Sequence, residues 1–347
     1  MIGSSATMQS EAGCRGARRR AAWTGAVGLA LGLLAVGFAL PAAHAQDHSN
    51  RPIRIVVGAA AGGGLDLQVR IIAQALPKVL GQEIVVENRP GGSGVIAGQV
   101  VASAPPDGDT LFAYGGDLFS VAALMPHTAF DANSRLVPIS EITETPLLVV
   151  TGGRSPFSNV KGLIAAAKAS PQGLTYATFA VASVNNVVGQ WIAKEAHIKL
   201  LNVTFRGGPE AALATAAGDV SLAIVSPASV YPSMVNAGTV KVIGLTSAQH
   251  PSYLPASWAT FADNGVPIDA YTFFGIFGPA GMSAAAIARL NHGFEVVLND
   301  DAVGERLRRV GIFAKHLGPA EFAKRIETDK IRCDGIIQDM HMIDAPR

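Results

Sequence analysis

The stretch that decides the fold is IRIVVGAAAGGGLDLQVRIIAQAL, which runs from Ile53 to Leu76. An apolar run leads into a loop of small residues, three glycines at 62–64, an aspartate and a helical pattern. Glycines allow backbone N–H groups to approach a ligand closely, and a helix start attracts negative charge. The stretch therefore predicts a strand–loop–helix unit that binds an anion; a tight turn without a ligand is the alternative.

The helical pattern covers residues 66–80, where apolar residues recur with the spacing of one buried stripe. Asp66 is the predicted N-cap of this helix, and Gly81 is its predicted stop. Pro77 is expected to kink or loosen the last turn, because proline lacks the N–H that a helix interior uses.

Similar short apolar runs follow along the chain, mostly without polar alternation, as is typical of strands covered on both faces. Helical patterns lie between most of them, which predicts an α/β fold with largely parallel sheets. Ligands in such sheets bind beyond the carboxyl ends of the strands. The predicted strands are residues 53–58, 83–88, 110–115, 147–152, 174–178, 198–205, 220–226, 240–247 and 271–278.

The N-terminus has the three parts of an export signal. A basic region ends at Arg20, an uncharged apolar run covers residues 21–40, and an Ala-x-Ala pattern ends at Ala45. We therefore expect residues 1–45 to be a signal peptide, removed after Ala45 in the periplasm. An uncleaved membrane anchor is the alternative, because the run is nearly long enough to span a bilayer.

The rest of the chain, 302 residues, holds 23 Lys+Arg against 25 Asp+Glu, because the leader takes four arginines and one glutamate. A formal charge of −2 without a concentrated basic patch argues against nucleic-acid binding. Cys333 is the one cysteine after residue 45, so no internal disulfide is expected. A chain of this length can bury a large core, in two domains.

The usual catalytic patterns are absent from the sequence. The glycines at 58 and 63 have phosphate-loop spacing, but Gly64 and Leu65 stand where that motif needs lysine and a hydroxyl residue. Ser93 lies in GGSGV, which is not a nucleophile elbow. The histidines are too scattered to form a metal cluster. We expect no catalytic residue, no metal and no cofactor.

The order of the motifs resembles the Bug family, the extracytoplasmic solute receptors of tripartite tricarboxylate transporters. The most specific part is VVENRPGGSGVIAG at residues 85–98, followed by APPDGDTL at 104–111. The resemblance continues through VTFRGGPEAALATAAGDVSLAIVS at 203–226 and FFGIFGPAGMSAAAIARLN at 273–291, and covers nearly all of the chain after Arg51.

This resemblance implies a type II periplasmic-binding-protein architecture of Venus-flytrap kind, in which each lobe is a mostly parallel sheet flanked by helices. The first lobe is expected to contain residues 46–147 and 269–347, and the second residues 148–268. The implied ligand is a small organic acid: a di- or tricarboxylate, an acidic amino acid or an aromatic carboxylate. The implied partners are membrane permease subunits, and the receptor is expected to be a monomer.

The expected ligand contacts lie in the loops after the strands. Asp66 is expected to shape the glycine loop, hold water or meet a ligand amine. Arg206 is expected either to clamp a distal carboxylate or to pair with Glu210. The full set of expected contacts is Ala60, Gly62, Gly63, Gly64, Asp66, Gly115, Gly116, Asp117, Thr178, Ser183, Asn186, Arg206 and Ser226.

The second ligand loop departs from the family pattern. Phe179 to Ala182 replace its glycine-rich part, and Asn186 replaces a histidine, which favours a ligand with an apolar portion. Phe273 and Phe274 are expected to belong to the core, with one of them able to wall the cleft, because adjacent strand residues point to opposite faces.

The leading interpretation is a binding protein that delivers its ligand to a permease without chemical conversion. A sensor that presents its ligand-bound form to a membrane signalling protein is the first alternative. An exported enzyme that acts on a small carboxylate is the second.

Overall fold

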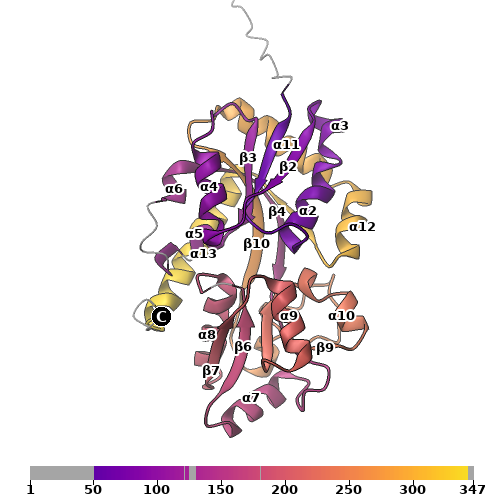
Figure 1. The fold of residues 1–347 in the computed structure, drawn as a ribbon, viewed down its shortest axis with the longest axis vertical. Helices are drawn as coiled ribbons and strands as arrows, with labels where there is room; N and C mark the ends of the chain where they lie inside the picture. Colours follow the sequence, from indigo (N-terminus) through magenta and orange to yellow (C-terminus); the bar gives the residue numbers. More distant parts are fainter. Residues whose placement is uncertain (1–50, 121, 125–129, 180, 343–347) are drawn as a thin grey trace, which may run out of the picture. The chain divides into compact units, whose positions relative to one another are not determined.

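A computed structural model describes residues 51–120, 122–124, 130–179 and 181–342. The expected signal peptide lies outside these residues. Two sheets form the framework (Figure 1). The six-stranded sheet contains β1 (Ile53–Val57), β2 (Ile84–Asn88), β3 (Thr110–Gly115), β4 (Leu136–Pro146), β10 (Tyr271–Pro279) and β11 (Ala314–Leu317). The five-stranded sheet contains β5 (Leu148–Gly152), β6 (Leu174–Thr178), β7 (Leu200–Thr204), β8 (Leu222–Val225) and β9 (Val240–Leu245).

Helices cover both sheets and make each of them the centre of one lobe. The α-helices are α2 (Gly64–Ala73), α3 (Leu76–Leu80), α4 (Val95–Ala102), α5 (Asp117–Ser120), α6 (Ala132–Arg135), α7 (Val160–Ala169), α8 (Val184–Glu195), α9 (Gly208–Ala217), α10 (Ser233–Asn236), α11 (Ala284–Leu298), α12 (Asp301–Arg309) and α13 (Pro319–Asp339). Short 3-10 turns are η1 (Gly92–Gly94), η2 (Ala122–Leu124), η3 (Pro227–Ser229) and η4 (Ala262–Asn264).

The two-lobe α/β architecture predicted from the sequence is confirmed, but the sheets are mixed. In the first sheet β1 runs parallel to β2 and β3, whereas β10 pairs antiparallel with both β3 and β4. In the second, β6 is parallel to β7 and β8, whereas β5 is antiparallel to β8 and β9. Strands β5 and β10 each follow a passage of the chain between the lobes, and β11 also pairs antiparallel with β4.

Two crossings between the lobes meet at Thr246. The first is the sharp passage from β4 through Leu147 into β5, and the second is the connection from β9 to β10. The buried Thr246 hydroxyl accepts from the Leu147 N–H at 2.9 Å and donates to the Ala270 carbonyl at 2.7 Å. One side chain therefore ties both crossings together.

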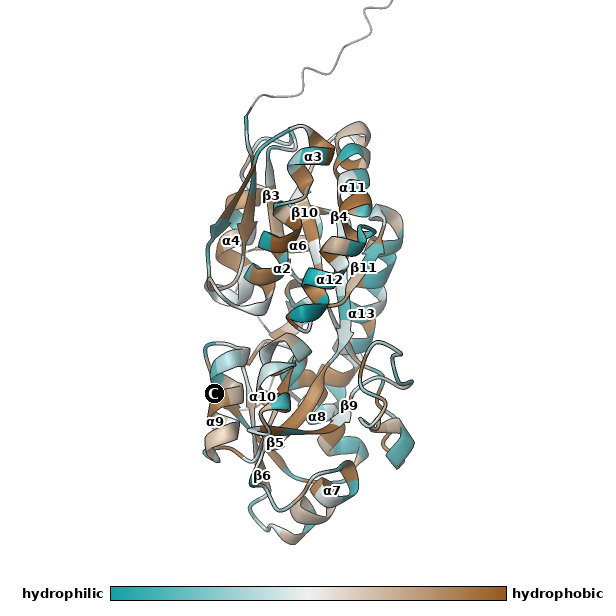
Figure 2. Cartoon of the chain, turned by 90° about the vertical axis from the view of Figure 1, so that its right-hand side faces the viewer, coloured by the Kyte–Doolittle hydropathy of each residue, from teal (hydrophilic) through white to brown (hydrophobic). Residues whose placement is uncertain are grey.

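Hydrophobic residues of the strands and of the inner helix faces form the cores, and hydrophilic residues prevail on outer surfaces such as that of α12 (Figure 2). Helix α13 contributes to the cores of both lobes. Its Phe322 and Ile326 pack with the first sheet and α4, whereas Cys333 and Ile337 pack with α8 and the second sheet. The C-terminal helix is thus a third connection between the lobes.

The predicted helix over residues 66–80 is two helices. Helix α2 ends at Ala73 and α3 begins at Leu76, with Pro77 in the first turn of α3, so the expected irregularity near this proline is confirmed. Gly81 ends α3 in the left-handed conformation at φ +69°, as predicted. The predicted N-cap was wrong: α2 begins at Gly64 and its N-cap is Gly63, which places Asp66 inside the first turn.

Candidate functional site

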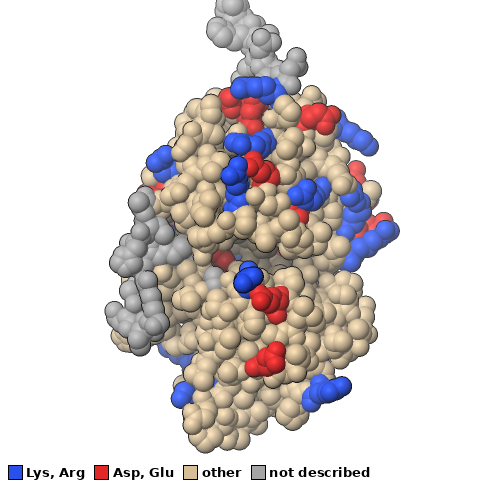
Figure 3. Space-filling model, in the orientation of Figure 1, with Lys and Arg blue, Asp and Glu red and all other residues tan. Residues whose placement is uncertain are grey.

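A pocket of about 640 Å³ lies between the lobes, within the size range of small-molecule sites. Its wall comes from loops after strands of both sheets and from β4 and β10, and Figure 3 shows the hollow between a more heavily charged upper region and the lower part. Within the described residues, the charged members of the wall are Asp117, Arg206 and Glu210. The wall is otherwise neutral.

The start of α2 forms one side of the pocket. Residues 58–65 all line it. Gly62 has a φ of +77°, which glycine adopts without strain, and no side chain caps Gly63. A Cβ atom added at Gly64 would lie 3.3 Å from the Cβ of Ala228, which belongs to the other lobe. The helix start therefore exposes backbone rather than side chains, as an anion site requires.

Asp66 is hydrogen-bonded to this loop but does not itself line the pocket. Its buried carboxylate accepts from the Gly62 N–H at 2.8 Å, from Arg70 Nε at 2.9 Å and from Asn88 Nδ2 at 3.0 Å. Burial raises the pKa of this carboxyl, but these three donors outweigh it and lower the pKa below its usual value. Asp66 thus shapes the glycine loop.

The start of α8 on the second lobe is closed by oxygen atoms of the protein. Ser183 is its N-cap, and the Ser183 hydroxyl accepts from the Asn186 N–H at 3.3 Å. The Val184 N–H, the first of the helix, donates to the Asp117 carboxylate from α5 of the first lobe. This hydrogen bond joins the two lobes beside the pocket.

Asp117 lines the pocket next to Tyr114. Burial is the main cause that raises the Asp117 pKa to about 7, the Asp329 carboxylate on α13 adds to it, and the bond from Val184 opposes it. The Tyr114 ring fits its place because Gly58 and Gly94 flank it; a Cβ at either would lie within 2.6 Å of the ring.

Arg206 precedes α9 and lines the pocket, exposed to solvent. Its backbone N–H donates to Glu210 Oε2 at 2.9 Å, while no ion pair holds the guanidinium within the described part of the chain. The expected pairing with Glu210 therefore involves the Arg206 backbone. The guanidinium is available for a ligand.

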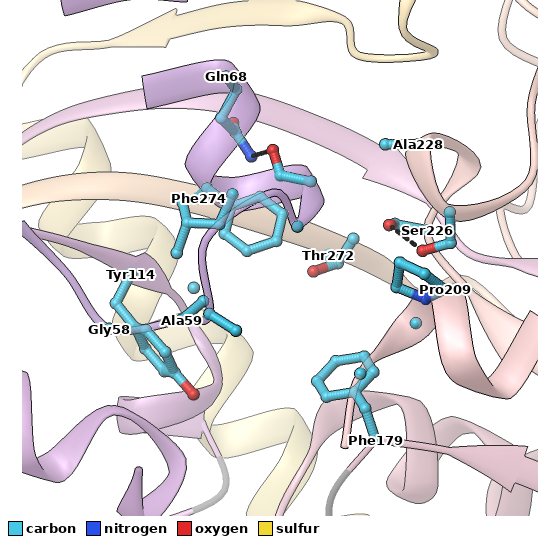
Figure 4. Close-up of a pocket in the computed structure, with 18 of the residues that line it drawn as sticks. Gly58, Ala59, Gln68, Tyr114, Phe179, Pro209, Ser226, Ala228, Thr272 and Phe274 are labelled. Carbon is cyan, nitrogen blue, oxygen red and sulfur yellow. Dashed lines mark hydrogen bonds between the residues drawn. The ribbon is translucent and has the colours of Figure 1, made fainter. Parts of the chain in front are cut away.

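Aromatic side chains give the pocket an apolar character. Tyr114 and Phe274 project from the first lobe, and Phe179 projects from the second (Figure 4). Phe274 lines the pocket while Phe273 is buried in the core, as their alternation on β10 predicts. Thr272 and Ser226 add hydroxyl groups to the wall, and in Figure 4 Thr272 lies between Phe274 and Ser226.

The structure brings most of the predicted contact residues together. Those in the pocket wall are Ala60, Gly62, Gly63, Gly64, Gly115, Asp117, Arg206 and Ser226. Those outside it are Asp66, Gly116, Thr178, Ser183 and Asn186.

The residues outside the wall have structural partners instead. Gly116 packs under the Phe273 ring, where a Cβ would lie 2.0 Å away. Thr178 is buried and accepts from Asn202 Nδ2 at 2.9 Å. Asn186 is held by the Tyr176 hydroxyl at 2.6 Å and by the Val181 carbonyl at 2.8 Å.

Sequence reasoning missed the wall formed by β4 and by the segment after α12. Thr143 of β4 donates to Gln68 Oε1 at 2.7 Å, and both line the pocket together with Ile312 and Phe313. Threonines beside glutamates gave no strand signal, and Phe313 follows a surface helix. No local pattern pointed to either segment.

A partly buried charged cluster surrounds Glu141 and Glu144 of β4. Glu144 pairs with Arg325 at 2.9 Å and with Lys315. Glu141 is fully buried, and neither of its carboxylate oxygens has a hydrogen-bond partner among the described residues. Burial, with the nearby Glu144 charge, raises the Glu141 pKa to about 8, so this side chain is largely protonated at neutral pH.

The described residues contain neither a candidate metal cluster nor a candidate membrane-spanning helix. They contain no group of three or more His, Cys, Asp or Glu side chains placed to hold a metal ion. None of the helices in the described ranges combines the length and apolar character needed to cross a membrane.

Comparison with known proteins gives a consistent set of relatives. Residues 68–342 match the model of the tripartite tricarboxylate transporter family receptor. A UPF0065 protein of Bordetella bronchiseptica is 32% identical over 285 residues, which cover 82% of this chain and 84% of that protein. The structure of R. palustris Rpa4515 with adipate has a TM-score of 0.79 and 25% identity, covering 85% and 99% of the two chains. MatC from Rhodopseudomonas palustris with bound malate has a TM-score of 0.75 and 25% identity, covering 83% and 99%.

Proposed function

The chain belongs to the tripartite tricarboxylate transporter family of receptors, as the motifs of its sequence indicate, and we propose that it captures a small organic carboxylate between its lobes for delivery to a membrane permease. The observation that carries this proposal is the pocket itself: a glycine loop at an uncapped helix start faces a free arginine across the gap between two lobes. Adipate and malate, which two relatives bind, are ligands of this class.

The proposed anion site combines backbone and side chain. A carboxylate near residues 62–64 meets the positive end of the α2 dipole and the N–H groups of its first turn. The Arg206 guanidinium supplies a charged, fork-shaped donor from the other lobe. Since the two lie on different lobes, a ligand that contacts both favours the closed arrangement by its differential affinity for that state.

The proposed role requires binding without chemical conversion, followed by recognition of the closed form in the membrane. The receptor is proposed to act outside the cytoplasm after removal of residues 1–45. A pull-down of membrane proteins with and without ligand tests the partner. Recovery of transporter subunits supports delivery, whereas recovery of a signalling protein would support the sensor alternative.

Thermal unfolding against a panel of small acids tests ligand capture. The panel contains di- and tricarboxylates, acidic amino acids and aromatic monocarboxylates. A ligand at 100 times its dissociation constant adds about 2.7 kcal/mol to the free energy of unfolding, which raises Tm by several degrees. A stabilising acid that the protein leaves chemically unchanged supports a receptor. Turnover of that acid would contradict it, and so would the absence of any stabilising acid.

A further inference from the structure

The start of α8 is less available to a ligand than its position beside the pocket suggests. Its first N–H, that of Val184, donates to Asp117, and its third, that of Asn186, donates to the Ser183 hydroxyl. The Asn186 N–H also donates to the Ser183 backbone carbonyl at 3.1 Å, so both N–H groups have partners in the protein. The first N–H groups of a helix are otherwise the ones that bind anions. In this protein one of its own carboxylates, from the opposite lobe, takes that place.

The charges of the wall reinforce this asymmetry. Arg206 is the single cation of the described wall, and the Asp117 and Glu210 carboxylates are its two acids. Asp117 lies at the Tyr114 side of the pocket, close enough to raise the pKa of the Tyr114 hydroxyl further after burial has raised it. Above about pH 7, where Asp117 is ionised, a ligand carboxylate placed there would meet a like charge in a poorly solvated site, which is unfavourable.

The surface between the two ends suits an apolar group. Tyr114 and Phe274 project from one side, and Phe179 projects from the other (Figure 4). Phe274 and Phe179 are half-buried, so both rings retain surface that a ligand can cover. Flat apolar groups pack favourably against such rings in stacked or edge-on arrangements.

We infer that the pocket selects a ligand with a single carboxylate and a flat apolar body, and that Asp117 disfavours a second carboxylate at the α8 end. The carboxylate lies toward the glycine loop and Arg206, and the apolar body lies among Tyr114, Phe179 and Phe274. This inference rests on the proposed function and narrows its ligand class, away from the diacids that the relatives bind.

A matched pair of probes tests the selection in the wild-type protein, purified from the periplasmic fraction after expression of the full chain. Benzoate and terephthalate share one ring and differ by one carboxylate. Calorimetric titration at pH 8 should show that benzoate binds at least about tenfold more tightly than terephthalate. A nearby like charge changes a pKa by about one unit or more, and one unit corresponds to a factor of ten in an equilibrium constant. Equal or tighter binding of terephthalate overturns the inference.

The variant Asp117→Asn tests the cause. Asparagine retains an oxygen that can accept from Val184 but lacks the charge. The ratio of benzoate to terephthalate affinity should fall about tenfold in this variant. The control Asp219→Asn makes the same change of net charge on the exposed end of the second lobe, outside the pocket wall, and should leave the ratio unchanged. An unchanged ratio in Asp117→Asn contradicts the role of Asp117.

The variant Phe179→Ala tests the place of the apolar body. It should weaken benzoate binding about tenfold and leave the affinity for acetate, which has no ring, unchanged. The placement is contradicted if the affinities for both acids fall equally, or if neither affinity falls. Failure of this inference is distinguishable from failure of the proposed function: a protein that prefers the diacid is still a carboxylate receptor, whereas one that binds no acid contradicts both.

Discussion

Helices α2 and α8 each follow a strand of their sheet and begin beside the same pocket, but their first turns are satisfied differently. Three glycines precede or open α2, no side chain caps it, and its loop faces the pocket. Helix α8 has a serine N-cap, and its Val184 N–H donates to the Asp117 carboxylate of the opposite lobe. The same strand–loop–helix unit thus presents backbone to a ligand on one lobe and is closed by the protein itself on the other.

Each helix start also has an aspartate in a contrasting electrostatic environment. Hydrogen bonds from Arg70, Gly62 and Asn88 lower the pKa of Asp66 despite its burial. Burial and the Asp329 charge raise the pKa of Asp117 to about 7, because a single backbone donor compensates only in part. Asp66 therefore stabilises the fold as an anion, whereas ionisation of Asp117 opposes folding.

The largest effect is expected from Asp66→Ala, which removes the support of the α2 loop. The free energy of unfolding should fall by about 3 kcal/mol, because the Gly62 N–H and Asn88 lose a buried acceptor and Arg70 loses its ion-pair partner. Benzoate affinity should fall as well, since the loop that faces the ligand is released. Urea denaturation and calorimetry measure the two effects. Stability within about 0.5 kcal/mol of wild type, the range of an ordinary surface substitution, contradicts the role.

Asp117→Asn should change stability in the opposite direction, and only at high pH. The folded protein retains the Asp117 proton up to about pH 7, whereas the ordinary pKa is 3.8, so wild-type stability falls as the pH rises through this window. The variant should therefore be more stable than wild type at pH 8, by on the order of 2 kcal/mol, and similar at pH 4.

Denaturation curves of both proteins at the two pH values test this difference. Glu141, whose pKa is raised to about 8, gives both proteins a further decrease in stability toward alkaline pH, which cancels in the comparison. A variant that is less stable than wild type at pH 8 contradicts the assigned charge state of Asp117.

A smaller loss is expected for Ser183→Ala at the start of α8. Removal of a serine N-cap costs about 1 kcal/mol, because the Asn186 N–H loses its side-chain acceptor. The melting temperature of the ligand-free protein reports this loss. No change in Tm indicates that Asp117 alone is sufficient to close the helix start.

The smallest effect on stability is expected from Gly63→Ser, which gives α2 the same N-cap that α8 has. Gly63 has an extended backbone with φ −75°, which serine adopts readily, so stability should change by only a few tenths of a kcal/mol. Ligand affinity should nevertheless fall, because the serine hydroxyl competes for the N–H groups that face the pocket. Unchanged calorimetric affinity for benzoate would remove the α2 start from the binding site.

The sequence predicted the strands and loops that follow local rules. Apolar runs identified β1 and β6, and the glycines at 62–64 identified the loop that lines the pocket. Strand β4 was missed because Glu141 and Glu144 interrupt its apolar pattern; both are accommodated by long-range packing against α13 and β11.

Two features of the site depend on contacts between distant segments and could not be read from any local pattern. The bond between Val184 and Asp117 joins residues of different lobes. Asp66 was expected to shape the glycine loop, hold water or meet a ligand amine. Asn88, from the next strand, and Arg70 hold its carboxylate outside the pocket wall, which leaves the first of these roles. The sequence thus predicts which polar residues lie in a loop beside the site, whereas the direction of each side chain depends on the partners that the fold supplies.

The most direct test of the difference between the two helix starts is a crystal structure of the protein with benzoate. We predict that the benzoate carboxylate lies about 3 Å from backbone nitrogens at the start of α2 or from the Arg206 guanidinium, with its ring among Tyr114, Phe179 and Phe274. Asp117 should still accept from Val184. A carboxylate bound to the Val184 N–H, with Asp117 displaced, would contradict the account.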